Sequence, residues 1–170
     1  MADTKFTRRG VVLGAAAVGL SACASKPKIS TYGGPKVTRV VVQKADRKMY
    51  LFSGTTMLES YDIELGFAPE GHKTVYGDGK TPEGSYYIDR RNPRSSFYLS
   101  LGISYPNAQD RMEAARLGKQ PGGDIFIHGQ RRPGDPKGPD WTAGCIAVKN
   151  KEMSEIYAMV QTGTRIDINP

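Results

Sequence analysis

A histidine and a cysteine in the last third of the chain have the residue types of a nucleophilic pair. His128 ends a short apolar run and is followed by Gly129, and Cys145 comes later, across a loop rich in glycine and proline. A cysteine nucleophile needs a base to remove its proton, because a free thiol has a pKa of about 8.5, and histidine is the usual base. A buried cysteine packed beside a core histidine would show the same spacing. Spacing alone therefore leaves catalysis and packing equally open.

The residue before Cys145 fits a turn that presents a nucleophile. Gly144 allows the backbone to come close enough for several amides to point at one spot. Amides arranged in this way can bind the oxyanion that forms when a carbonyl is attacked. Acyl transfer is therefore the chemistry that we expect of a catalytic pair here.

The amino-acid sequence of these segments resembles that of the YkuD-type L,D-transpeptidase domain. That family carries His-Gly, a loop of about this length, and then Ser/Thr-x-Gly-Cys with an apolar residue, as in Ile127-His128-Gly129 and Trp141-Thr142-Ala143-Gly144-Cys145-Ile146. Upstream, Thr81-Pro82-Glu83-Gly84 is similar to the family's Thr-Pro-x-Gly hairpin, and residues 163–168 are similar to its C-terminal closure. The resemblance covers residues 37–168, and its details look like the YafK-like branch.

The resemblance implies a peptidoglycan-modifying cysteine enzyme that acts on stem peptides. Cys145 would attack the carbonyl of the third stem residue, and His128 would act as general base and acid. D-alanine would depart as the leaving group, and an acyl-enzyme would form. Thr142 fills the family's Ser/Thr position as a supporting residue, and Gly144 would serve the oxyanion site and the loop geometry. No metal and no organic cofactor is implied. We name Tyr105, Trp141 and His72 as candidate substrate-binding residues.

Two departures from the family pattern leave the acceptor open. Ala143 stands where the family often has histidine, and Ala147 stands where many members have arginine. Both changes remove polar groups near the acyl site. For the YafK-like branch, which the segment resembles, cross-link synthesis is not assumed, so an L,D-type hydrolase that trims stem peptides or releases a wall-linked lipoprotein is an alternative to a transpeptidase. A non-catalytic peptidoglycan-binding lipoprotein is a third reading.

The apolar pattern predicts a mainly β fold with short helices, and the resemblance implies the family's β-sandwich with the Cys/His site on loops at strand ends. Short β-branched runs separated by turns are typical of strands, and apolar residues at helical spacing predict helices. We expect a long loop over residues 66–84. The predicted strands cover residues 37–43, 48–53, 57–65, 85–89, 97–103, 124–128 and 164–168, residues 145–148 are apolar, and the predicted helices cover residues 108–117 and 151–161.

The N-terminus has the pattern of an export signal. Lys5, Arg8 and Arg9 precede an apolar run over residues 10–22, which is shorter than the roughly 20 residues that span a bilayer. Leu20-Ser21-Ala22-Cys23 resembles a lipobox, which implies lipidation of Cys23. We therefore predict a signal over residues 1–22, a flexible tether over 23–35 and a catalytic domain over 36–170. The arginine pair is twin-arginine-like, so both export routes stay open.

Net charge and cysteine usage restrict the classes of partner and metal site that the protein could have. The chain carries +7, of which the signal contributes +2, and a mildly basic exported domain suits an anionic wall polymer. With Cys23 in the lipobox, Cys145 is left as a lone thiol without a disulfide partner, and two histidines with one thiol argue against a structural zinc site. We expect a monomer that binds no nucleic acid, in the periplasm, lipid-anchored to a membrane, with the outer membrane weakly favoured.

Overall fold

The computed structural model describes residues 27–170 of the chain, so the predicted signal and Cys23 lie outside the described residues. Over the described range the protein is mainly β, as the sequence predicts. The strands are β1 (Arg39–Gln43), β2 (Lys48–Ser53), β3 (Thr56–Asp62), β4 (Gly84–Asn92), β5 (Ser100–Ile103), β6 (Phe126–His128), β7 (Ile146–Ala147) and β8 (Arg165–Asn169), and the helices are α1 (Ala108–Arg116) and α2 (Asn150–Met159).

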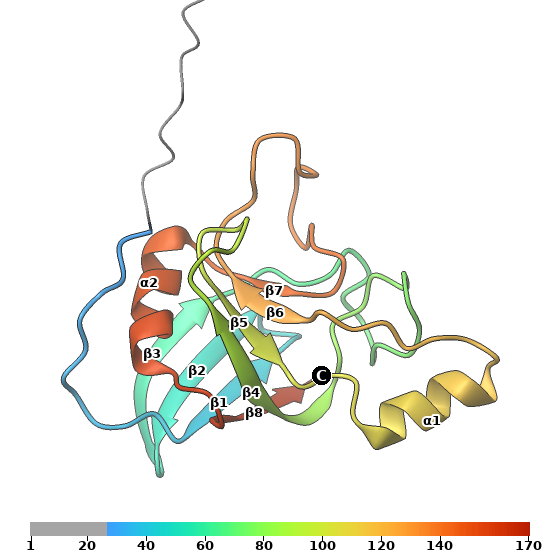
Figure 1. Ribbon diagram of the computed structural model, residues 1–170, viewed down its shortest axis with the longest axis horizontal. Helices are drawn as coiled ribbons and strands as arrows, with labels where there is room; N and C mark the ends of the chain where they lie inside the picture. The colour runs from blue at the N-terminus through green and yellow to red at the C-terminus, as the bar shows by residue number, and fades with distance from the viewer. Residues whose placement is uncertain (1–26) are drawn as a thin grey trace, which may run out of the picture.

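The strands form one sheet in the order β3-β2-β1-β8-β4-β5-β6-β7 (Figure 1). β4 joins the two halves of this sheet, because residues 84–87 pair with β8 and residues 88–92 pair with β5. The pairing with β5 shifts register between Ile88 and Arg90, which is where a bulge bends and twists a strand. Beyond β3 the chain meets the far edge of the sheet through a bridge between Glu64 and Ala147. The two ends of the sheet are thus linked beside β7.

A single hydrophobic core lies between the two halves of the sheet. In β1, Val40 and Val42 are fully buried, and β2 alternates, with Met49 and Leu51 buried and the residues between them partly exposed. In the other half, Ile127 of β6 and Ile146 of β7 are fully buried. Each apolar side chain of this size contributes roughly 1.5–3 kcal/mol when it is removed from water. Burial of these isoleucines fixes the strands that carry the candidate site.

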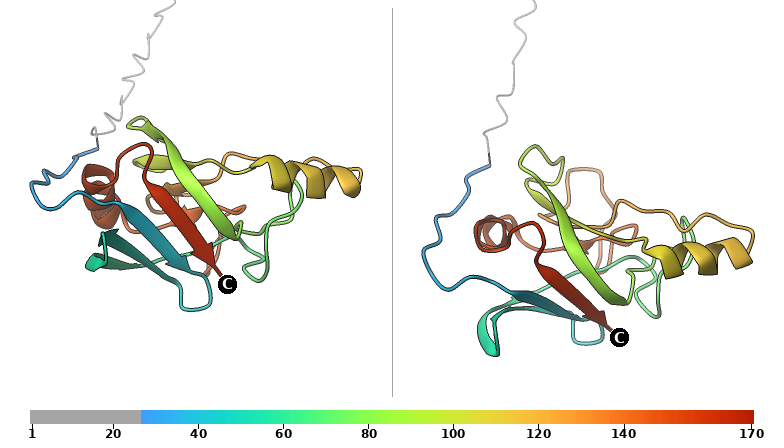
Figure 2. Two further views of the ribbon diagram at one scale, coloured as in Figure 1. Left: turned by 90° about the horizontal axis from the view of Figure 1, so that it is seen from below. Right: turned by 60° about the horizontal axis from the view of Figure 1, so that its bottom comes forward.

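The two helices have different roles, which Figures 1 and 2 make visible. α2 packs along the core and buries Met153, Ile156 and Tyr157, whereas α1 projects from the other end of the molecule and buries only Asp110 and Ala114. α1 is held at its start by a capping box, in which Asn107 and Asp110 each accept the other's backbone N–H. Within residues 27–170, neither helix is long and apolar enough to cross a bilayer.

Several element boundaries differ from the prediction. The third predicted strand ends at Asp62 rather than residue 65, because the chain leaves β2 there to bridge Ala147. Residues 97–99 do not extend β5: Tyr98 has φ +76° and the Leu99 N–H donates to the Phe97 carbonyl, so this stretch is a turn. The apolar residues 145–148 contain the short strand β7, Ile146–Ala147. The loop predicted at residues 66–84 is present up to β4.

Asp167 joins three strands through one carboxylate. It lies in β8 and is buried, with bonds from Arg39 of β1 at 2.5 Å, from Ser85 of β4 at 2.5 Å and from Arg165 at 2.9 Å. Burial raises the pKa of Asp167, but the hydrogen bonds from Arg165, Ser85 and Arg39 outweigh this effect and hold it at about 2.

We predict that Asp167→Asn lowers the free energy of unfolding at pH 7 by about 2 kcal/mol. Because the folded pKa lies below the ordinary value of 3.8, the contribution of the charge is complete above that value and is lost as pH falls toward 2. Urea unfolding at pH 7 and at pH 3 measures this. Asp62→Asn, whose carboxylate is exposed, is the control and should change little. An equal loss at both pH values would contradict the prediction.

Candidate active site

Strand pairing places the two predicted catalytic residues at neighbouring strands, His128 at the end of β6 and Cys145 directly before β7. β6 and β7 run parallel, with Ile127 opposite Ile146 and His128 opposite Ala147. Residues that face each other across a ladder share a face of the sheet, and so do residues two apart along one strand. Cys145 immediately precedes β7, two residues before the position opposite His128, and the alternation of β7 continued by one residue assigns it to the same face as His128.

The His128 ring is clamped by aromatic side chains. His128 is 4% exposed, its ring centroid is 4.5 Å from that of Phe97, and the Trp141 ring meets it edge-on at 5.6 Å. Phe97 and Trp141 also pack on each other at 5.7 Å. A ring held on two sides has little freedom to turn, so its nitrogens are aimed in fixed directions.

One hydrogen bond selects the tautomer of His128. Its Nδ1 lies 2.7 Å from the carbonyl oxygen of Gly129, which can only accept, so Nδ1 carries the proton and Nε2 keeps its lone pair. Burial lowers the pKa of His128, against the raising effect of the Gly129 carbonyl and of Asp135. At neutral pH the ring is therefore uncharged, with Nε2 available as a base.

The Cys145 thiol is partly exposed and rests against backbone. Its Sγ lies 3.5 Å from the carbonyl oxygen of Asp124, to which it donates, rather than in a hydrogen bond to His128. Asp124 has φ +54°, an unusual conformation for a residue other than glycine, and its side chain is held by Arg90 at 3.0 Å. Burial raises the pKa of Cys145 to about 11, although a hydrogen bond from the Phe126 backbone opposes this. The resting pair is a thiol and a neutral imidazole.

The turn before Cys145 is built around Thr142. Its Oγ1 donates to the Cys145 carbonyl at 2.7 Å and accepts from the Gly144 N–H at 3.2 Å, so one hydroxyl ties both ends of the turn. Gly144 has φ +128°, and a Cβ there would lie 2.5 Å from the Lys80 carbonyl oxygen. Glycine is therefore required at this position, both for the backbone conformation and for the space.

A second glycine, which the sequence analysis does not single out, lies under this turn. A Cβ on Gly66 would lie 2.0 Å from the Gly79 carbonyl oxygen and 2.9 Å from the Gly144 Cα. The same segment is paired with the nucleophile turn, since the Thr142 N–H donates to Leu65 and the Phe67 N–H donates to Thr142. The only signal for Gly66 in the sequence is its position at the start of the long loop.

Of the three candidate substrate residues, Trp141 packs on the His128 ring. Tyr105 is 5% exposed and donates to the Pro121 carbonyl at 3.0 Å. His72 accepts the Glu83 N–H on Nδ1 and points Nε2 at Asp110, 3.3 Å away. Tyr105 and His72 thus belong to a network around Asp110 that holds α1 and the long loop. Within residues 27–170, the aromatic rings that pack on His128 are those of Phe97 and Trp141, not those of Tyr105 or His72.

Residues that the sequence analysis does not select complete the surroundings of His128. Arg132 stacks on Phe97 at 4.2 Å, and Arg131 lies over Trp141 at 5.4 Å. Arg131 also bonds Glu64 at 3.3 Å. Within residues 27–170, the Trp141 Nε1 is the one buried side-chain polar atom without a hydrogen-bond partner. Phe97 carries no sequence signal, because its role depends on a turn that brings it beside β6.

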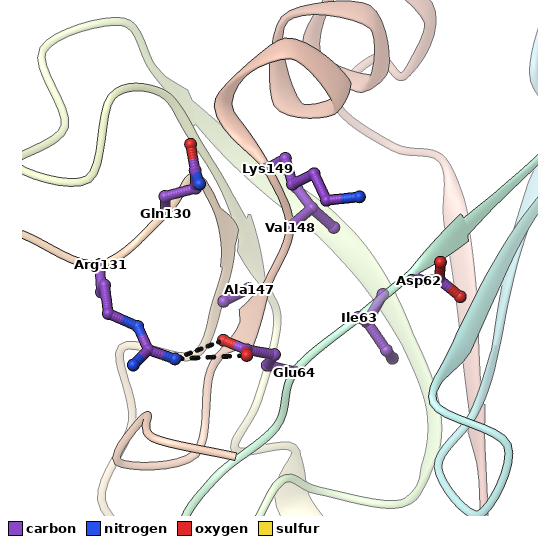
Figure 3. Close-up of a pocket in the computed structure, with 8 residues that line it drawn as sticks. All are labelled: Asp62, Ile63, Glu64, Gln130, Arg131, Ala147, Val148 and Lys149. Atoms are coloured by element: carbon purple, nitrogen blue, oxygen red, sulfur yellow. Dashed lines mark hydrogen bonds and ion pairs between the residues drawn. The ribbon is translucent and has the colours of Figure 1, made fainter. Parts of the chain in front are cut away.

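A cavity of about 280 Å³ adjoins the site (Figure 3). Figure 3 shows Arg131 reaching across to Glu64 on one side, with Ala147 beside this pair and Lys149 farther away. His128 and Cys145 do not line it. The residues that do are Asp62, Ile63, Glu64, Gln130, Arg131, Ala147, Val148 and Lys149.

Metal binding has no support in the described part of the chain. Among residues 27–170, no three His, Cys, Asp or Glu side chains are grouped closely enough to hold a metal ion. The chemistry available at this site is that of a cysteine, a histidine and backbone amides.

Comparison with known proteins identifies the family. The model of the YkuD family, described as the L,D-transpeptidase catalytic domain, matches residues 37–168. The chain belongs to the L,D-transpeptidase catalytic-domain family. The family that the sequence resembles is thereby confirmed, and so is the L,D-transpeptidase type of fold.

Relatives of this L,D-transpeptidase-family domain are longer proteins. YafK of Escherichia coli strain K12, whose name gives L,D-transpeptidase as a provisional assignment, is 29% identical over 132 residues, which are 75% of this chain and 48% of YafK. The solved structure of the helical cell shape determining protein Pgp2 from Campylobacter jejuni has a TM-score of 0.60 and 25% identity, over 84% of this chain and 51% of Pgp2. Bd1075 of Bdellovibrio bacteriovorus has a TM-score of 0.56 and 25% identity, over 85% and 51%. The chain spans about half the length of these relatives.

We predict that Gly144→Ala destabilises the domain more than Gly163→Ala does. Both glycines have positive φ, but a Cβ at Gly163 would meet nothing within 4 Å, whereas one at Gly144 would clash with the Lys80 carbonyl. The clash should add roughly 1–3 kcal/mol to the loss in the free energy of unfolding. Urea unfolding of the two variants measures the difference, and equal losses would show that the turn can shift.

We predict that iodoacetamide alkylates Cys145 of the free protein more slowly at pH 7 than it alkylates a cysteine in a flexible peptide. The thiolate is the reactive form, and a pKa raised to about 11 by burial leaves little of it. The rate should keep rising above pH 9, as followed by mass spectrometry of the peptide that contains Cys145. A midpoint below 9 that is lost in His128→Ala would instead reveal a preformed thiolate–imidazolium pair.

Proposed function

We propose that this domain is a peptidoglycan-modifying cysteine enzyme, an L,D-transpeptidase that acts on stem peptides through a Cys145 acyl-enzyme. The observation that carries the proposal is the fixed tautomer of His128, which keeps Nε2 as a base on the strand beside Cys145. Family membership over residues 37–168 supports it. We assign Cys145 as nucleophile, His128 as general base and acid, and Thr142 and Gly144 to the geometry of the turn.

The first half-reaction breaks an amide and forms a thioester. His128 Nε2 takes the thiol proton while Sγ leaves the Asp124 carbonyl and attacks the carbonyl of the third stem residue. Because both groups are neutral at rest, proton transfer accompanies attack rather than preceding it. The amine of D-alanine then leaves with the proton from His128. The Gly144 N–H is already bonded to Thr142, so we assign the Cys145 N–H to the oxyanion.

The second half-reaction breaks the thioester. An amine from another stem peptide attacks the acyl carbon, His128 accepts its proton and returns it to Sγ, and a new amide forms. No metal or organic cofactor takes part. If water attacks instead, the product is a free carboxylate and the enzyme is a hydrolase.

One observation favours the hydrolase as a second candidate. Ala147 is small, and a cavity of about 280 Å³ adjoins it beside Arg131 and Glu64. The cavity is lined by charged as well as apolar side chains, and one of this size has room for water close to β7. Release of a wall-linked lipoprotein or trimming of stem peptides would follow. By analogy with Pgp2, either activity would affect cell shape.

We also propose that the chain acts outside the cytoplasm. Its first residues have the pattern of a cleaved export signal ending at Cys23, and the acyl chains added there would hold a monomeric domain at a membrane facing the periplasm, with the outer membrane favoured. Cys23→Ser should leave the domain folded but release it from membranes. The intact mass of the native protein, with or without acyl chains, tests this.

The enzyme proposal is tested with sacculi that still carry attached lipoprotein. We predict that the full-length chain yields products that disappear in both Cys145→Ala and His128→Ala, and that Thr142→Ala lowers their rate without abolishing it. Mass spectrometry separates the outcomes. Loss of D-alanine with gain of an amine identifies a transpeptidase, and released lipoprotein or trimmed stems without new bonds identify a hydrolase.

Identical results with the wild type and Cys145→Ala would refute both activities for these substrates. Retention of sacculi by such a protein would then identify a binding module. Tyr87→Phe, an exposed residue of β4 remote from this turn, serves as the control for the substitutions.

A further inference from the structure

The chain just before β1 is hydrogen-bonded to the domain through its backbone. The Tyr98 hydroxyl accepts the Lys28 N–H at 3.1 Å and donates to the Lys28 carbonyl at 2.9 Å. The Ser154 hydroxyl of α2 also donates to that carbonyl, at 2.5 Å, and accepts the Ser30 N–H at 2.9 Å. Figure 1 shows this segment, in blue, running beside α2. Two hydroxyls thus hold three backbone groups within the region predicted as a tether.

Tyr98 is also the centre of a turn with an unfavourable backbone. Its φ is +76°, and the Leu99 N–H donates across it to the Phe97 carbonyl at 3.0 Å. A γ-turn with positive φ is rare and strained, and such a conformation persists only where surrounding contacts hold it. The Tyr98 ring packs against the core, and its hydroxyl is held by Lys28.

The same turn contacts both His128 and Gly129. The Phe97 ring lies on the imidazole at 4.5 Å, and the Phe97 carbonyl accepts the Gly129 N–H at 2.9 Å. Gly129 in turn supplies the carbonyl that binds His128 Nδ1. A Cβ at Gly129 would lie 2.6 Å from the Phe97 carbonyl oxygen and 3.0 Å from the Tyr98 Cβ, so the two segments are in direct contact.

We propose that Tyr98 and Ser154 are positioning residues, which couple the docking of residues 28–30 to the orientation and tautomer of His128. The docked segment holds the Tyr98 turn, the turn holds Phe97 and Gly129, and these two hold the imidazole. Residues 28–30, which follow the predicted lipid site, then help to position the active-site histidine. The kinetic consequence rests on the proposed function, whereas the structural coupling does not.

The test uses the full-length chain and two ways of breaking the dock. Lys28→Pro removes the N–H that Tyr98 accepts, and Tyr98→Phe removes the hydroxyl while keeping the ring. Ile29→Pro is the control for proline, because the Ile29 N–H makes no hydrogen bond to the described residues, and Tyr87→Phe is the control for loss of a hydroxyl. Lys28 is exposed, so its substitution should leave the fold intact.

The direct readout is the tautomer of His128. The chain has two histidines, so ¹⁵N-labelled histidine gives two sets of ring signals, which His72→Gln assigns. At pH 8 the wild type should show His128 protonated on Nδ1. Lys28→Pro and Tyr98→Phe should move its shifts toward a mixture of tautomers, and the two controls should not. Unchanged shifts in both variants would overturn the coupling.

The second readout is the rate of acyl-enzyme formation from a stem peptide. A misplaced base should lower kcat roughly tenfold in Lys28→Pro and Tyr98→Phe, with KM nearly unchanged, because substrate contacts are intact. An equal kcat in variants and controls would also overturn the proposal. If the wild type forms no acyl-enzyme, the proposed function fails, and the tautomer comparison still decides the coupling.

Discussion

The parallel pairing of β6 with β7 is the interaction on which the rest of the site depends. It is only two residue pairs long, yet it sets His128 opposite Ala147, with Cys145 two residues before that position. Burial of Ile127 and Ile146 fixes this register, because a slip by one residue would turn both isoleucines out of the core and both functional side chains into it. The chemistry is therefore held in place by apolar packing on the opposite face.

In the resting site, the thiol and the imidazole are both neutral rather than a preformed ion pair. Burial lowers the pKa of His128 and raises that of Cys145, so desolvation stabilises the neutral form of each group. A pair of this kind protects the thiol from oxidation, because little thiolate is present until a substrate engages it. The proposed reaction requires Sγ to rotate away from the Asp124 carbonyl.

Glycines and strained residues concentrate around this pair. Gly144 and Gly66 let the nucleophile turn cross a neighbouring segment, while Asp124 and Tyr98 adopt positive φ beside the thiol and the imidazole. Backbone strain of this kind persists only where many contacts support it. The long loop, the loop before β6 and the segment before β1 all contribute such contacts, so the site draws on most of the domain.

The sequence by itself determined the mainly β class, most strands to within a few residues, the family, and the candidate pair His128 and Cys145 with Thr142 and Gly144. These follow from local patterns, namely apolar alternation and a motif whose residues are close in the chain. It could not select Phe97, Gly66 or Asp124, nor show that Tyr105 and His72 serve the α1 network, because those roles depend on contacts between distant segments. The tertiary structure decided them, along with the tautomer of His128 and the docking of residues 28–30, since long-range packing fixes which backbone groups meet.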